Sequence, residues 1–440
     1  MCARSGAVIA LLALLGGAIS GCRGQDRAEP AATEGHILAM RAAGGGSRLD
    51  RAIGELQQDL RREPRSSERW ISLGEAWVRK AREAADPGLY HSADDAARAA
   101  LALAPDTPRA LVLRGLVLLE AHRFEEARQL AEGLVEHAPG DTAALGVLSD
   151  ALLELGSFEE AARAAQRMMD LKPNLPSYAR ASYLLWLQGD VAGSLEAARL
   201  AADAGGDAES RAWARTQAAL VSWHRGDLDG AEDALRRALR ELPEHPAALA
   251  AMGRVALSRR DFPAARGWLE RAYARAPLPE TAWLLGDARG ASGDKEGAAA
   301  AYDRVVRDGR ASDRRTLALF FATKGREPEE AVRLAEAERA VRDDIYTEDA
   351  YAWALHRAGR LAEADAAARK ATRLGTPDAR LLWHAGAIRI ARGERRQGIA
   401  LLRRALRLNP EFDLTGAAEA RRLLAEALRP RRVALARETR

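Results

Sequence analysis

The sequence has few cysteines, aromatic residues and β-branched residues, and each scarcity excludes a class of protein. Its 440 residues include two Cys, and only 5% are Phe, Trp or Tyr. Ala and Leu supply most of the 48% of residues that are apolar. Because both are strong helix formers, an all-β fold is excluded. The apolar content is also high enough to exclude global disorder.

An excess of charge of one sign is also lacking. The 67 Lys and Arg nearly balance the 63 Asp and Glu, which leaves a formal net charge of +4. Almost all of the basic residues are Arg, since the chain has only five Lys. Without a strong basic excess the composition does not indicate nucleic-acid binding, and we expect no nucleic-acid partner.

The N-terminus has the pattern of a secretory signal. Ala7 to Ile19 is an apolar run of 13 residues, shorter than the ~20 residues that cross a bilayer as a helix. It therefore fits the core of a signal peptide over residues 1–21. The run ends in Ile19-Ser20-Gly21-Cys22, which resembles the bacterial lipobox. An ordinary signal peptide with a chance cysteine is the alternative.

The lipobox resemblance implies that Cys22 carries a lipid and becomes the first residue of an exported, envelope-anchored protein. In a Gram-negative cell the anchor would lie at the periplasmic face of the outer membrane. Cleavage would leave Cys22 as the sole cysteine, so no disulfide could form within the mature chain. We predict a flexible tether over residues 22–47 and a basic tail over residues 429–440. No later segment is predicted to span a membrane.

Residues 48–428 contain a repeated pattern. Pro105, Pro139 and Pro173 are 34 residues apart, Pro243 and Pro277 have the same spacing, and Pro410 closes a later copy. Small residues stand 12 positions before five of these prolines, at Ala127, Ala161, Ala231, Ala265 and Gly398. Turn glycines precede many small residues by five positions, at Gly156, Gly189, Gly226, Gly293, Gly359 and Gly393. The pattern predicts helix, glycine-containing turn, helix and proline-marked stop.

This pattern resembles the tetratricopeptide repeat, a helix-turn-helix unit of 34 residues. The resemblance implies an all-α, right-handed α-solenoid of about ten units with N- and C-terminal capping helices. Small residues at repeat positions 8 and 20 would let the two helices approach, and apolar residues near position 24, such as Leu269 or Tyr302, would fill the space beside them. We expect each unit to contact mainly its neighbours, so that stability is nearly a nearest-neighbour property.

The resemblance extends beyond the generic repeat. The stretch from Thr347 to Leu361, the stretch from Leu374 to Arg380 and the motif Asn409-Pro-Glu-Phe-Asp413 look like a widespread group of bacterial tetratricopeptide proteins. That group has no agreed biochemical role. The likeness therefore implies a fold rather than a function.

The sequence has no motif of a known catalytic or cofactor site. It contains neither a phosphate-binding loop, nor His-Glu-x-x-His, nor Gly-x-Ser-x-Gly. The eight histidines have no partner at metal-ligand spacing. Acidic pairs such as Asp343-Asp344 are interpreted as helix-start or surface residues. We therefore predict a protein that is not an enzyme and that has no catalytic residues, no metal and no cofactor.

The tryptophans follow the register of the repeat. First-helix positions 2, 5, 9 and 12 form one helical stripe, which faces the concave groove of such a solenoid. Six of the nine tryptophans fall on this stripe, together with Tyr183 and His356. The six are Trp186, Trp213, Trp223, Trp283, Trp353 and Trp383. Trp70 and Trp77 occupy ordinary core positions instead.

Two interpretations of this stripe remain open. In the first, the rings line a groove that grips an extended or helical peptide, with Asp150, Arg254, Asp287 and Asp349 as polar contacts. The rings would then be partly solvated in the free protein. In the second, they pack between successive first helices, where an Ala-rich protein needs bulk.

We favour a non-catalytic scaffold or adaptor, lipid-anchored in the cell envelope, that binds a protein or peptide in the aromatic-lined groove. One alternative is an accessory subunit of an envelope assembly or secretion machine. An alternative of another class is a small-molecule-binding, glycan-binding or enzymatic accessory protein.

Overall fold

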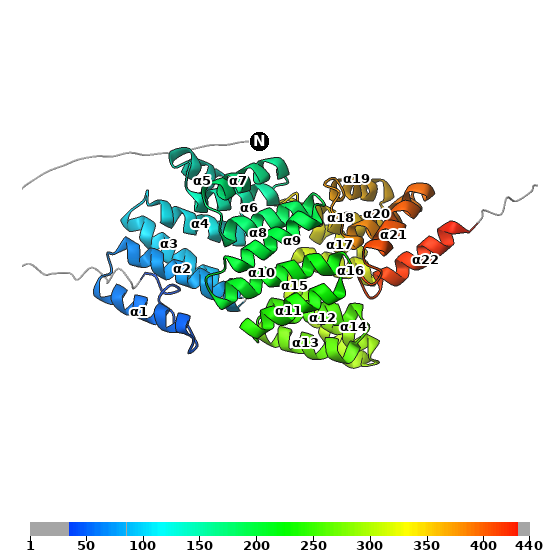
Figure 1. Cartoon of the computed structure of the whole chain (residues 1–440), viewed down its shortest axis with the longest axis horizontal. Helices are drawn as coiled ribbons and strands as arrows, with labels where there is room; N and C mark the ends of the chain where they lie inside the picture. Colours follow the sequence, from blue (N-terminus) through cyan, green and yellow to red (C-terminus); the bar gives the residue numbers. More distant parts are fainter. Residues whose placement is uncertain (1–34, 85, 430–440) are drawn as a thin grey trace, which may run out of the picture.

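The computed structural model describes residues 35–84 and 86–429, which fold into consecutive antiparallel helix pairs (Figure 1). Within these residues there are 22 α-helices and no strand. None of the described helices is long and apolar enough to cross a bilayer. The predicted signal peptide, Cys22 and the tail beyond residue 429 lie outside the described residues.

Ten helix pairs follow one another, as the repeat count predicts. Their first helices are α2 (Ser67–Ala84), α4 (Pro108–Glu120), α6 (Thr142–Glu154), α8 (Leu175–Leu187), α10 (Ala208–His224), α12 (Pro246–Ser258), α14 (Pro279–Ala291), α16 (Arg314–Lys324), α18 (Ile345–Arg357) and α20 (Ala379–Ala391). Their second helices are α3 (Tyr90–Leu103), α5 (Phe124–His137), α7 (Phe158–Leu171), α9 (Val191–Asp203), α11 (Leu228–Glu241), α13 (Phe262–Arg275), α15 (Lys295–Ser312), α17 (Pro328–Arg339), α19 (Leu361–Ala371) and α21 (Arg395–Leu408). The all-α solenoid fold is therefore confirmed.

Additional helices stand at both ends and in the first pair. Helix α1 (Arg48–Arg62) precedes the first pair, and α22 (Gly416–Leu428) follows the last one at the opposite end of the molecule (Figure 1). A short 3₁₀ helix, η1 (Pro87–Leu89), lengthens the connection inside the first pair.

The prolines end the second helices at a constant distance. Each of the six helices concerned stops two residues before its proline, because a residue that precedes proline disfavours the helical conformation. The helix ends are Leu103, His137, Leu171, Glu241, Arg275 and Leu408, and the prolines are Pro105, Pro139, Pro173, Pro243, Pro277 and Pro410. The spacing in the sequence thus sets the ends of the helices.

Glycines serve both the turns and the helix contacts. All six predicted turn glycines have φ between 78° and 86°, the left-handed region that side chains rarely adopt. Within the pairs, a Cβ atom at Gly253 would overlap the Leu269 side chain, and one at Gly286 would overlap Tyr302. The small residue at position 8 thus gives room to the position-24 side chain of the same unit.

The start of the described chain differs from the predicted tether. His36 Nδ1 lies 2.9 Å from an Asp95 carboxylate oxygen, and the backbone amides of Leu38 and Ala39 donate to the same carboxylate at 3.1 and 3.0 Å. The Trp77 indole donates to the Ala39 carbonyl at 3.0 Å. Residues 36–41 are therefore docked on the first helix pair, and the tether can extend only to about residue 35.

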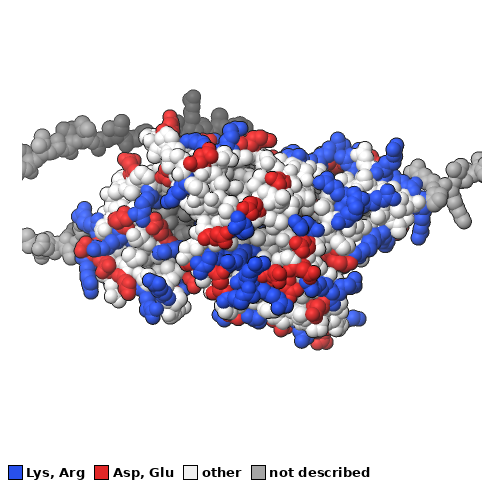
Figure 2. Space-filling model, in the orientation of Figure 1, with Lys and Arg blue, Asp and Glu red and all other residues white. Residues whose placement is uncertain are grey.

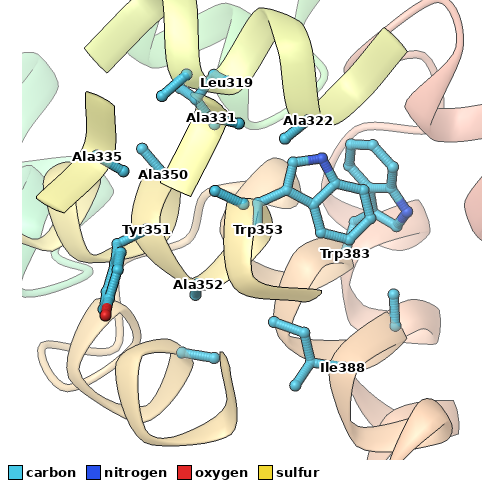
Figure 3. Packing of buried hydrophobic residues seen from close by; sticks show 14 of the residues in the cluster. Leu319, Ala322, Ala331, Ala335, Ala350, Tyr351, Ala352, Trp353, Trp383 and Ile388 are labelled. Carbon is cyan, nitrogen blue, oxygen red and sulfur yellow. The ribbon is translucent and has the colours of Figure 1, made fainter. Parts of the chain in front are cut away.

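The largest aromatic cluster lies in the core of the C-terminal half. The Trp353 and Trp383 rings lie 4.8 Å apart, and His384 stacks on Trp353 at 4.1 Å with an interplanar angle of 13°. Figure 3 shows the two tryptophans side by side among alanines of neighbouring helices. Their side chains fill the space that the small alanine side chains leave between successive first helices.

Contacts between distant units hold one turn of the solenoid against the next. The amide of Asp343 donates to the Glu154 carbonyl at 2.8 Å. Thr376 Oγ1 donates to the Leu187 carbonyl at 2.6 Å, and Asn409 Nδ2 donates to the Trp223 carbonyl at 2.7 Å. We call these three hydrogen bonds the inter-turn contact. The last two join residues 189 and 186 positions apart.

The inter-turn contact adds to the contacts between neighbouring units, which make up most of the packing in the solenoid. At 34 residues a unit, a separation of 189 residues corresponds to about five and a half units. Ion pairs also cross this interface, since Arg342 Nη1 lies 3.3 Å from Glu154 Oε2. Apolar side chains do so too, because Ile345 and Leu381 belong to the same buried cluster as Leu152 and Phe158. Units three to five therefore also contact units eight to ten.

Trp353→Ala should destabilise the protein by ~3–5 kcal/mol, because it empties a fully buried aromatic site. Tyr183→Ala is the control, since Tyr183 is 44% exposed whereas Trp353 is 0% exposed. Urea unfolding of both variants gives the comparison. Equal, small losses of stability would contradict the packing described above.

Asn409→Ala should speed hydrogen exchange in the turn between α10 and α11, 186 residues away along the chain. The substitution removes one of the two donors to the Trp223 carbonyl, which keeps the Gly226 amide at 2.9 Å. The loss of one such hydrogen bond costs ~0.5–1.5 kcal/mol. Hydrogen exchange followed by mass spectrometry measures the effect by segment. Asn174→Ala is the matched control, because Asn174 caps only its own helix α8. An increase in exchange confined to residues 405–420 would show that the inter-turn contact contributes nothing.

Candidate functional site

The predicted aromatic stripe is mostly buried. The exposed fractions are 3% for Trp186, 6% for Trp223, 8% for Trp283, 0% for Trp353 and 1% for Trp383. Trp213 and His356 are half-buried, and Tyr183 is exposed. The expectation of partly solvated groove tryptophans is therefore wrong for five of the six rings. Packing between successive first helices describes these five rings, because the alanines around them leave room for large side chains.

Two indole groups of the aromatic stripe form hydrogen bonds at the interface between the two turns of the solenoid. Trp186 Nε1 donates to the Tyr346 hydroxyl at 3.1 Å. Trp223 Nε1 donates to Ser258 Oγ at 2.8 Å, and that hydroxyl donates to the Glu411 carbonyl at 2.9 Å. Trp186 and Trp223 thus help to join the two turns of the solenoid.

The four predicted polar contacts all have partners within the chain. Asp150 accepts from Arg180 at 2.8 and 2.5 Å, and Arg254 donates to Glu280 at 2.8 Å. Asp287 accepts from the Tyr302 hydroxyl at 2.6 Å and from Lys324 Nζ at 2.5 Å. Asp349 Oδ1 lies 2.9 Å from His384 Nδ1.

Asp287 and Asp349 are both buried, whereas Asp150 and Arg254 are not. Burial raises the pKa of the Asp287 carboxyl despite the ammonium of Lys324 beside it. The contacts with Tyr302 of α15 and Lys324 of α16 hold the Asp287 carboxylate inside the free protein. Asp287 therefore has a structural role in the free protein.

Polar side chains that the sequence interpretation did not select line the inner surface of the solenoid. Glu280, Tyr346 and Arg380 occupy position 2 of the seventh, ninth and tenth units, on the same stripe as the tryptophans. The Glu280 side chain is 53% exposed. Tyr183 is also exposed, yet the surrounding protein raises the pKa of its hydroxyl by desolvation. Such groups face solvent that is enclosed by the protein.

A small cavity opens on this inner surface beside the inter-turn contact. Its volume is about 80 Å³. Apolar and polar residues from both turns of the solenoid line it. They include Leu153, Glu154, Tyr183, Leu187, Arg315, Asp344 and Tyr346. Burial raises the pKa of the Glu154 carboxyl and of the Tyr346 hydroxyl.

Some charges of the inner surface are only loosely paired. Arg315 Nη1 lies 3.5 Å from Asp344 Oδ1, and His224 Nδ1 lies 3.5 Å from Asp378 Oδ2. Among the described residues no carboxylate comes within 4.0 Å of the Arg380 guanidinium, whose Nε is buried and has no hydrogen-bond acceptor. Burial opposes the charge of Arg380, but Asp378, Asp349 and Glu280 outweigh burial and raise its pKa. Arg380 is thus an available cation inside the solenoid.

The register rule could have found part of this inner surface. It selects position 2 in every unit, and in the seventh, ninth and tenth units that position holds a charged or phenolic side chain. The polar residues chosen by the rule stand at positions 5 and 9, and so Glu280, Tyr346 and Arg380 were missed. Arg315 is likewise the second residue of its helix, α16, but the irregular spacing of the eighth unit concealed it.

No other chemistry stands out in the described part of the chain. Over residues 35–84 and 86–429, no three His, Cys, Asp or Glu side chains converge in a way that could hold a metal ion.

Comparisons with known proteins define the fold. Sequence models of the tetratricopeptide repeat match residues 78–142, 118–183 and 216–278. No curated protein matches the sequence. Among solved structures, pilF of Pseudomonas aeruginosa is 16% identical, with a TM-score of 0.39 over 44% of this chain and 88% of the other. Human IFIT1 is 14% identical, with a TM-score of 0.47 over 87% of this chain and 92% of the other.

These structural similarities are too distant to indicate a partner. The repeat matches agree in position with the helix pairs from α2 to α8 and from α10 to α13. The remaining pairs have glycines with positive φ in their turns, and the last of them also ends before a proline. Tetratricopeptide repeats therefore make up residues 78–183 and 216–278, and the other helix pairs continue the same solenoid.

Proposed function

We propose that this protein is an envelope-anchored scaffold that binds a peptide segment of another protein on the inner surface of its solenoid. The tetratricopeptide repeat fold supports a protein-interaction role. The proposal that a peptide binds on the inner surface rests on one observation. The polar surface around Tyr183, Arg315 and Arg380 is enclosed, and its polar groups are incompletely paired.

The inner surface differs from an ordinary core in its solvation. A polar group that folding removes from water is normally hydrogen-bonded within the protein. Arg380 lacks such a partner among the described residues, and Tyr183 keeps 44% of its surface exposed. A ligand that supplies a carboxylate or a backbone carbonyl would satisfy Arg380. An extended peptide offers both groups along its length.

The size of the cavity supports a peptide over a larger ligand. Its volume of about 80 Å³ is well below the ~300–1,000 Å³ of typical small-molecule sites. It can accept one side chain of a segment that lies along the inner surface. We therefore favour a scaffold over the small-molecule-binding or glycan-binding alternative.

A photo-reactive amino acid at position 183 should crosslink one discrete partner in cells. Position 171 is the control, because Leu171 is 52% exposed at the end of second helix α7. Arg380→Glu should reduce the yield from position 183, since it reverses the charge of the inner surface. Immunoblotting measures the adducts, and circular dichroism checks that the variant stays folded.

Equal adducts from positions 183 and 171, or none from position 183, would contradict the inner-surface site. So would an unchanged yield in a folded Arg380→Glu variant.

We also propose that a lipid on Cys22 anchors the scaffold in the cell envelope, at the periplasmic face of the outer membrane in a Gram-negative cell. The proposal rests on the lipobox Ile19-Ser20-Gly21-Cys22 after a short apolar run. Because docking begins at His36, the chain between Cys22 and the folded part can span at most about 50 Å. The scaffold would therefore stay close to the membrane.

Cys22→Ser should leave the protein unprocessed or move it from the membrane to the soluble fraction, because serine has no thiol to accept the diacylglycerol. Fractionation and metabolic labelling with a radioactive fatty acid measure the two effects. Lipidation would be refuted by unchanged labelling together with unchanged membrane association.

A further inference from the structure

The last helix pair and its cap carry a concentration of positive charge. Residues 379–429 contain eleven Arg and five Asp or Glu, a net charge of +6, whereas the whole chain has +4. The rest of the chain is therefore net negative. Figure 2 shows Lys and Arg gathered at the end of the molecule where Figure 1 places α20 and α21. Elsewhere on this face the two signs are interspersed.

Helix α21 concentrates this charge on one stripe. It has five Arg and no acidic residue. Arg396, Arg403 and Arg407 are seven and four residues apart, a spacing that places them on one helical face. All three are exposed. In the described chain no carboxylate comes within the 4.0 Å ion-pair distance of any of them. We call these three residues the α21 arginine stripe.

Other second helices carry acidic residues that pair with some of their surface arginines. Arg163 lies 3.8 Å from Glu160 on α7, and Arg199 lies 2.6 Å from Glu196 and 2.8 Å from Asp203 on α9. Arg236 lies 2.5 Å from Glu232 on α11. Such i,i+3 and i,i+4 pairs are the common arrangement on an exposed helix. The α21 arginine stripe departs from it and leaves its charges available.

We propose that the α21 arginine stripe docks on an anionic phospholipid surface. Protein interfaces usually have an apolar or aromatic centre, but α21 contributes none of the exposed large apolar side chains of the described chain. Its exposed face offers arginines with small or polar neighbours such as Gln397 and Ala400. That composition fits attraction to charged headgroups without burial of apolar surface.

The position of the α21 arginine stripe would determine how the solenoid is oriented on the membrane. Helices α1 and α21 lie toward opposite ends of the long axis (Figure 1). Contact through α21 would therefore hold the solenoid along the membrane rather than upright on its N-terminal end. The stripe does not require the lipid on Cys22, so it can be tested without that lipid.

The test measures binding of the mature chain that begins at Arg23, which has no cysteine to acylate. Vesicles contain phosphatidylcholine alone or an equal mixture with phosphatidylglycerol, and flotation separates bound from free protein. We expect binding only to the anionic vesicles, and its loss at high salt, because salt screens exposed charges.

The stripe variant is Arg396→Glu, Arg403→Glu, Arg407→Glu, and it should bind the anionic vesicles at least tenfold more weakly. The matched control is Arg163→Glu, Arg199→Glu, Arg236→Glu, which changes the net charge equally on exposed second-helix positions. The control should bind within twofold of the unmodified chain. Circular dichroism confirms that both variants are folded.

Four results would overturn the proposal: no binding to anionic vesicles, equal binding to uncharged vesicles, an equal loss in the control variant, or unweakened binding by the stripe variant. Soluble polyglutamate distinguishes an acidic protein partner from a lipid surface. If it binds the chain as tightly as the anionic vesicles do, the stripe recognises acidic polypeptide and the membrane proposal fails.

Discussion

The inter-turn contact depends on a property of every α-helix, the unsatisfied carbonyls of its last turn. Glu154 and Leu187 are the last residues of α6 and α8, and Trp223 is the penultimate residue of α10. Their carbonyls accept hydrogen bonds from the loops that precede α18, α20 and α22. Three successive first helices thus present a carbonyl acceptor in their last turn. Three successive loops of the later units supply the donors.

Contact between the two turns, together with packing of neighbouring helices, accounts for the burial of the aromatic stripe. In an open solenoid the concave face meets solvent, and rings at positions 5 and 9 would be partly exposed. Here the second turn covers part of the first. Trp353 of α18 packs against Trp383 and His384 of α20. Polar groups at position 2, such as Arg380, are left around a narrow enclosed space. Closure therefore contributes to the burial of Trp186 and Trp223 and creates the inner surface, whereas Trp353 and Trp383 are buried by their neighbouring helices.

The fold could be predicted from the sequence because each repeat carries its own signals. Proline 34 residues after proline marks the helix ends, and glycine in the left-handed turns marks the connection within a pair. The contact between the two turns could not be predicted. Thr376 and Asn409 donate to carbonyls 189 and 186 residues away, and every residue has a backbone carbonyl, so the sequence does not indicate which one accepts. The repeat positions of the tryptophans could be derived from the sequence. These positions show which face of the helix carries each ring, but they do not show what covers that face.

Closure also sets a condition on binding. A partner that inserts a single side chain can use the cavity of about 80 Å³ with both turns in place. A partner that needs a wider groove must first separate the turns, and the free energy of the inter-turn contact is then subtracted from its affinity. Loosening that contact would weaken the first kind of partner, whose site is built from both turns. It would strengthen the second kind, so the direction of the effect identifies which form of the solenoid binds.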